Sequence, residues 1–138
     1  MTAGPLICYE STFPALARAQ VRRGADVLVT VSNDAWFGPS AGAEQHFLMG
    51  RVRAIETRRW LLRAGNDGVT AAIAPSGRVT ARLPRGVAGA LPVFFAQTTT
   101  VTPYVRWGEW VTALSVLALL GLGLGPRGWV RPGTRPAA

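Results

Sequence analysis

The chain has 138 residues, of which 49% are hydrophobic, so it is long enough to form one domain with its own core. Its net charge is +8, and all 15 of its basic residues are arginine. The arginines are scattered and no aromatic-basic motif accompanies them, so we expect no nucleic-acid partner. Anionic lipid head groups match this charge equally well.

The cysteine and histidine content limits the chemistry further. A single cysteine excludes an internal disulfide, and one cysteine with one histidine cannot complete a metal site without several carboxylates. No glycine-rich phosphate-binding loop of the common spacings is present. The sequence therefore predicts no metal and no cofactor.

The first elements are typical of an α/β layered domain. Residues 5–9 and 26–32 are short apolar runs, and the second is rich in β-branched residues, as in a strand buried on both faces. A helix over residues 14–23 is predicted between them, with Ser11 or Thr12 as its N-cap.

The middle of the chain continues the pattern with a helix, a strand, a hairpin and a further strand-like stretch. These elements are predicted at residues 43–59, 60–64, 69–74 with 78–83, and 87–101. In the helix, Phe47, Val52 and Ile55 form the predicted apolar stripe, whereas Arg58 and Arg59 are expected to face water. Residues 1–106 are thus predicted to form one domain.

Residues 107–126 are predicted to form a transmembrane helix. The stretch from Trp110 to Pro126 contains no charged residue, and its length is at the short end of what spans a bilayer. Tryptophans flank it at positions 107 and 129, as interfacial anchors do. The alternative is a buried core helix, which would be apolar on every face.

The flanking charge predicts the orientation of that helix. Arginines follow it directly, so residues 127–138 are expected to form a basic tail in the cytoplasm by the positive-inside rule. Residues 1–106 would then lie on the external side of the membrane.

Cys8 is the candidate nucleophile. It ends an apolar strand just before a helix, where free backbone N–H groups and the helix dipole can activate a thiol and hold an oxyanion. The opposing interpretation is a small buried hydrophobic residue, which describes most lone cysteines. Glu10 lies two residues further on and would either support the thiol or serve as a first-turn carboxylate facing the dipole.

Three other side chains are candidates for the same site. His46 is the only histidine; it would serve as a base for Cys8 or, more usually for such a position, as a structural hydrogen-bonding group. Trp36 and Phe37 stand in a polar loop after a buried strand, where α/β sites are built. They would either line a pocket for an apolar substrate chain or cover the domain's own core.

Several segments, in order along the chain, resemble the signatures of the apolipoprotein N-acyltransferases, which belong to the nitrilase, or carbon-nitrogen hydrolase, superfamily. The segments are Ile7-Cys8-Tyr9-Glu10 with Phe13-Pro14, Ser32 to Gly38, Gln45-His46, Arg51 to Glu56, Leu61 to Ala64, Asn66 to Thr70 and Thr102-Pro103-Tyr104. The resemblance covers about residues 4–125. Any one of these motifs is weak, but several in the right order are specific.

The resemblance implies a fold and a reaction. The fold is a nitrilase-like αββα sandwich followed by one transmembrane helix. In the reaction, a cysteine thiolate takes an acyl chain from a phospholipid as a thioester and passes it to the N-terminal amine of a diacylglyceryl-cysteine apolipoprotein. Cys8 is then the nucleophile and Glu10 a second catalytic residue, while Tyr9, Trp36 and Phe37 bind substrate.

The same resemblance implies a location in the cell and indicates that two catalytic residues of the family are absent from this sequence. Enzymes of this family lie in the bacterial cytoplasmic (inner) membrane, with the nitrilase-like domain on the extracytoplasmic side. Their catalytic triad is Glu–Lys–Cys, with both partners upstream of the cysteine, and this sequence contains no lysine. We therefore expect this chain to be an inactive C-terminal fragment, from a truncated reading frame or a split protein. We also expect it to fold poorly alone, because half of a sandwich leaves apolar faces uncovered.

Two other functions fit the sequence less closely. One is a membrane-anchored nitrilase-like amidase, and the other is an inactive remnant in which Cys8 is inert. Asp67 also departs from the family, where Asn-Asn-Gly is expected instead of Asn66-Asp67-Gly68.

Overall fold

The structure, a computed structural model, describes residues 1–124. One five-stranded sheet, in the order β1-β2-β3-β4-β5, organises residues 1–108. The first three strands are parallel and the last two continue the sheet antiparallel. The strands are β1 (Ala3–Ile7), β2 (Val27–Asn33), β3 (Trp60–Asn66), β4 (Thr70–Ile73) and β5 (Val79–Leu83). The predicted α/β class is confirmed, and the sheet is mixed.

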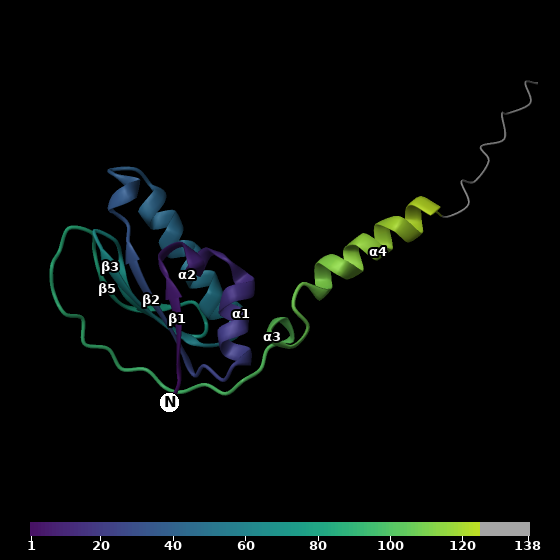
Figure 1. Cartoon of the computed structure of the whole chain (residues 1–138), viewed down its shortest axis with the longest axis horizontal. Helices are drawn as coiled ribbons and strands as arrows, with labels where there is room; N and C mark the ends of the chain where they lie inside the picture. The colour runs from purple at the N-terminus through teal and green to yellow at the C-terminus, as the bar shows by residue number, and fades with distance from the viewer. Residues whose placement is uncertain (125–138) are drawn as a thin grey trace, which may run out of the picture. The chain divides into compact units, whose positions relative to one another are not determined.

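Two helices, α1 (Pro14–Arg22) and α2 (Gly42–Thr57), cover one face of this sheet (Figure 1). Each connects two neighbouring parallel strands, as crossover helices do. The core between the helices and the sheet consists of small and branched apolar side chains around one aromatic ring, namely Leu6, Ala17, Val21, Leu28, Phe47, Ala54, Leu61, Val69, Ala71, Ile73 and Val105.

The buried side of α2 differs from the predicted apolar stripe. Phe47 is buried as expected, but Val52 and Ile55 are exposed. The helix instead turns small and polar residues to the sheet: Ala43, His46, Gly50, Arg53, Ala54 and Thr57. Arg59 was also predicted to face water and is buried, because its guanidinium donates to the carbonyls of Ala25, Thr57 and Thr100.

The other face of the sheet is open at its parallel edge. Ile7 and Val31 are neighbours in the β1–β2 register, and both point away from the helices, with exposed fractions of 58% and 54%. Apolar side chains of this size usually face a second layer. Half of an αββα sandwich would leave a face of this kind uncovered.

Residues 87–101 are not the predicted strand. In the structure they form an extended segment without regular secondary structure. The segment passes the end of the sheet where β2 and β3 begin: Phe95 packs on Trp60 with ring centroids 6.5 Å apart, and Arg59 donates to the carbonyl of Thr100 at 2.6 Å. Gly89 and Pro92 explain the difference, since both weaken strand pairing.

A short helix, α3 (Pro103–Trp107), ends the first unit. Arg18 of α1 donates from Nε and Nη2 to the carbonyls of residues 104–106, at 3.0 to 3.2 Å, and Val105 is buried in the core. Gly108 follows with a φ of 69°, a left-handed conformation that suits glycine and ends the helix.

A second unit begins at Glu109, and after that residue its described part is the uncharged helix α4 (Trp110–Leu124), 15 residues long. Within residues 1–124, no helix combines the length and the apolar character needed to cross a membrane. The predicted span of residues 107–126 is therefore not confirmed. Trp107 belongs to α3 instead, and the end of the span and the predicted tail at 127–138 lie outside the described residues.

Candidate active site

Parallel pairing brings the candidate residues to one edge of the sheet. Ile7 lies opposite Val31, and Asn33 lies opposite Asn66, so β1, β2 and β3 end side by side. Ligand sites of α/β proteins form beyond such carboxyl ends. Cys8 follows β1 at this edge, and Ser32 lies near the end of β2.

Cys8 sits in a strained turn. Its φ is 50°, in the left-handed region that non-glycine residues rarely adopt, and it begins a 3-10 turn, η1 (Cys8–Thr12). Such strain persists only where neighbouring groups enforce it and is concentrated at functional sites. The Cys8 side chain is half-buried.

Glu10 is one of the groups that enforce this turn. Its Oε2 accepts a hydrogen bond of 2.7 Å from the backbone N–H of Ile7, so the carboxylate closes the turn around Cys8. Ser11 is buried and donates to the carbonyl of Cys8 at 3.0 Å. The predicted N-cap role of Ser11 or Thr12 is wrong: the N-cap of α1 is Phe13, with Pro14 in the first turn as expected.

Behind Cys8 lies a buried carboxylate, Asp34, which directly follows β2. Ser32 Oγ donates to Asp34 Oδ1 at 2.6 Å and lies 3.5 Å from the sulfur of Cys8. The side chain of Arg63, on β3, donates from Nη2 to Asp34 Oδ2 at 2.7 Å. Asp34 and Arg63 are both almost completely buried, so they form an ion pair inside the protein.

His46 contacts the same carboxylate from α2. Its Nδ1 lies 2.9 Å from Asp34 Oδ1, and its Nε2 lies 3.1 Å from both Ser11 Oγ and the carbonyl oxygen of Cys8. No hydrogen bond within residues 1–124 joins His46 to the Cys8 sulfur. The geometry thus favours the structural role of His46 over that of a base for the thiol.

The charge state of this network follows from its hydrogen bonds. Burial by itself raises the pKa of Asp34, but donors from Ser32, Arg63 and His46 together outweigh it, and the pKa lies below the usual value for aspartate. Asp34 is therefore ionised at neutral pH and accepts hydrogen bonds only. His46 accordingly donates its Nδ1–H to it.

Gly68 closes the network from the turn after β3. A Cβ at this position would lie 2.8 Å from the Cγ of Asp34 and closer still to its Oδ2. We expect Gly68→Ala to destabilise the intact protein by about 1–3 kcal/mol, because the buried Asp34 cannot move without breaking its three hydrogen bonds.

Pulse proteolysis in a urea gradient would measure this loss. Gly89→Ala is the matched control. Gly68 and Gly89 both line a surface hollow at the end of β3, but a Cβ at position 89 would meet only Leu83 Cδ1, at 3.8 Å. Equal midpoints for both variants would contradict the close packing of Gly68 on Asp34.

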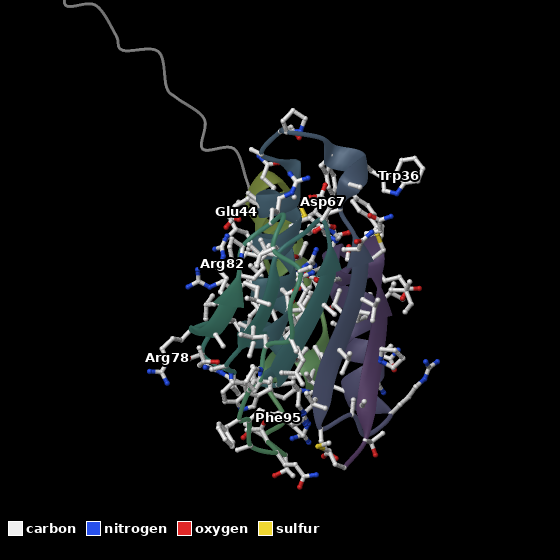
Figure 2. The ribbon with its side chains drawn as sticks, turned by 90° about the vertical axis from the view of Figure 1, so that its left-hand side faces the viewer. Trp36, Glu44, Asp67, Arg78, Arg82 and Phe95 are labelled. Atoms are coloured by element: carbon white, nitrogen blue, oxygen red, sulfur yellow. The ribbon has the colours of Figure 1, made fainter. Side chains whose placement is uncertain are left out.

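Two of the predicted substrate-binding residues lie together and one does not. Tyr9 and Phe37 line a small apolar hollow of about 110 Å³ above His46, with their ring centroids 5.9 and 5.8 Å from the imidazole. Trp36, by contrast, is 87% exposed and projects away from the sheet (Figure 2). The structure gives Trp36 no role in covering the core.

A larger polar hollow of about 380 Å³ lies at the end of β3, lined by the turn 65–68, Thr70 and residues 86–89. Asp67 stands at its edge with a φ of 46°. Its carboxylate pairs with Arg85 Nη2 at 2.9 Å, while Arg85 Nη1 donates to the carbonyl of Gly38 at 2.7 Å. Arg85 therefore neutralises the unexpected charge of Asp67 and ties this turn to the loop that carries Trp36.

Sequence reasoning missed Ser32, Asp34 and Arg63. Arg63 gave a usable signal, since a charged residue within an apolar strand requires a buried partner. In residues 1–124 no group of three or more His, Cys, Asp or Glu side chains could hold a metal ion. The groups that meet at this edge of the sheet are a thiol in a strained turn and, behind it, a buried charge network.

Comparisons with known proteins identify the family of this chain. The carbon-nitrogen hydrolase family model matches residues 1–102. The chain is 44% identical over 120 residues to the apolipoprotein N-acyltransferase of Pseudomonas syringae pv. tomato, and the match covers 87% of this chain and 24% of the relative. It is also 44% identical over 133 residues to the apolipoprotein N-acyltransferase of Azotobacter vinelandii, covering 96% of this chain and 26% of that one. The chain spans about a quarter of the length of these curated relatives.

Solved structures show the same fold at lower identity. A variant of the amidase from Nesterenkonia sp., in which acrylamide has added to the active-site cysteine, aligns with a TM-score of 0.60 and 19% identity over 83% of this chain and 44% of that one. A carbon-nitrogen hydrolase from Helicobacter pylori aligns with a TM-score of 0.55 and 15% identity over 60% and 36%. With the family model matching well over half of its residues, the chain belongs to the carbon-nitrogen hydrolase family.

Proposed function

We propose that this chain carries the nucleophile of an apolipoprotein N-acyltransferase. The observation that carries the proposal is the position of Cys8, at φ 50° in a turn closed by Glu10 and Ser11, in a chain 44% identical to enzymes of that name over most of its length. Strain at a half-buried cysteine at the carboxyl end of a strand supports a reacting thiol rather than a core residue.

The reaction consists of two acyl transfers. The Cys8 thiolate attacks the ester carbonyl of a phospholipid; an S–C bond forms, the ester C–O bond breaks, and the lysophospholipid alkoxide takes up a proton. The amine of a diacylglyceryl-cysteine apolipoprotein then attacks the thioester; a C–N bond forms, the S–C bond breaks, and the proton that the amine loses returns to the sulfur. In the Glu–Lys–Cys triad of the apolipoprotein N-acyltransferases, the Glu and the Lys precede the cysteine. This chain contains no lysine, so both groups would come from outside these 138 residues.

Aromatic residues around Cys8 fit an acyl donor. Tyr9 and Phe37 line the apolar hollow beside the turn, and the exposed Trp36 stands on the same loop as Phe37. Glu10 is placed to hold the turn, so its support of catalysis would act through the position of Cys8. The apolar helix α4 would form part of a membrane anchor in the bacterial inner membrane, with residues 1–106 on the extracytoplasmic side.

The test is the intact mass of the membrane-purified chain after incubation with phosphatidylethanolamine, alone and co-expressed with the upstream part of a related enzyme. We expect an acyl-sized, hydroxylamine-labile adduct on Cys8 only when the upstream part is present. An adduct from the chain alone would show that Cys8 needs no external lysine. No adduct in either sample, with folded protein, would favour the inactive remnant, and release of ammonia from amides would favour the amidase.

A further inference from the structure

Ser32 and Asp34 form a hydrogen-bonded pair directly behind the sulfur of Cys8, and the proposed reaction assigns no role to either. Ser32 Oγ lies 2.6 Å from Asp34 Oδ1 and 3.5 Å from Cys8 Sγ. Ser32 is buried and Asp34 is fully buried, so water does not compete strongly for these contacts.

The single hydroxyl proton of Ser32 can serve only one of these two neighbours. The distance of 2.6 Å to an ionised carboxylate is that of a strong, charge-assisted hydrogen bond, whereas 3.5 Å to sulfur is a weak one. Ser32 therefore donates to Asp34 and presents its oxygen lone pairs to Cys8. A thiol S–H can donate to these lone pairs, but a thiolate would face an oxygen that has no proton to offer.

Two further hydrogen bonds hold the Asp34 carboxylate in place, so its hydrogen bond with Ser32 is not easily broken. Arg63 Nη2 donates to Oδ2 at 2.7 Å, and His46 Nδ1 donates to Oδ1 at 2.9 Å. The other ring nitrogen of His46 lies 3.1 Å from the carbonyl oxygen of Cys8, so the same network contacts the backbone of the nucleophile. The carboxylate and the turn of Cys8 are thus parts of one rigid unit.

We propose that Ser32 and Asp34 are positioning residues that keep the proton on the Cys8 thiol until a base from outside this network removes it. The S–H bond is directed toward Ser32 Oγ, which fixes the sulfur and suppresses its reaction with other electrophiles. The inference rests on Cys8 being the reacting group of the proposed function.

The test is the rate at which iodoacetamide labels Cys8 in the intact protein, followed by mass spectrometry of the peptide that contains it. At pH 7 we expect Ser32→Ala to raise this rate by roughly two- to tenfold, the range that one hydrogen bond contributes to an equilibrium. At high pH the labelling rates should converge, because hydroxide in the solvent removes the thiol proton in every variant. Asp34→Asn should raise the rate at pH 7 in the same direction if the variant folds.

Thr30→Val is the matched control. Thr30 is a fully buried residue two positions earlier on β2, and within the described residues its hydroxyl has no hydrogen-bond partner. The rate at which iodoacetamide labels Cys8 in Thr30→Val should equal that in the wild type at every pH. An unchanged or slower rate at pH 7 in Ser32→Ala, an equal rise in Thr30→Val, or a difference that persists at high pH would each overturn the proposal. None of these outcomes involves phospholipid, so the proposed acyl transfer is tested separately.

Discussion

Replacing Cys8 by serine is expected to abolish acyl transfer in the intact protein. Serine keeps the size and the polar group of the side chain, but its hydroxyl is a much poorer nucleophile without a base beside it, and His46 is occupied by Asp34, Ser11 and the carbonyl of Cys8. We expect a loss of at least roughly a thousandfold, as is usual when a nucleophile is removed. The measurement is N-acylation of a lipoprotein substrate in cells that depend on the variant.

Glu10→Gln is the companion variant. The amide oxygen of the introduced glutamine can still accept from the N–H of Ile7, so the turn should persist while the charge beside it is lost. We expect weakened but measurable transfer. Normal lipoprotein acylation with Cys8→Ser would refute the nucleophile, and a complete loss with Glu10→Gln would indicate that Glu10 touches the substrate.

Replacing Arg63 by methionine is expected to destabilise the domain by about 3 kcal/mol at neutral pH. Removing one member of a buried ion pair costs about 3–5 kcal/mol, because the remaining charge has no partner. We expect the lower end of this range for Arg63→Met. Arg63 Nε and Nη1 are buried without a hydrogen-bond partner within the described residues, so removing these two polar atoms is favourable and offsets part of the destabilisation.

The pH dependence of this loss identifies its cause. The folded-state pKa of Asp34 is depressed, so its contribution to stability is present above the unfolded value of about 3.9 and disappears as the pH falls through the folded pKa. The difference between Arg63→Met and the wild type should therefore shrink as the pH falls below the unfolded value and through the folded pKa of Asp34. Pulse proteolysis at several pH values would measure it.

Arg82→Met provides the control on the surface. Arg82 pairs with Glu44 at 2.7 Å, but both side chains are almost half exposed, and Figure 2 shows them at the surface beside β5. Exposed pairs contribute about 1 kcal/mol or less. A loss in Arg63→Met no larger than that in Arg82→Met would contradict a buried, ionised Asp34.

The local sequence determined much of the fold. Apolar runs at β1 and β2, the helices between the strands and the hairpin of β4 and β5 were all predicted, because hydrophobic periodicity and turn residues act over a few positions. The segment 87–101 was misassigned as strand-like because apolar content alone does not supply a pairing partner.

The sequence by itself also determined the family and the position of Cys8, since both are written in short contiguous motifs. Only the tertiary structure decided what surrounds the thiol. Ser32 and Asp34 on the second strand and just after it, His46 on α2 and Arg63 on the third strand are separated along the chain and meet because parallel strands end at one edge. Burial then makes their hydrogen bonds obligatory, and no pattern of single residues reveals which buried polar groups become partners.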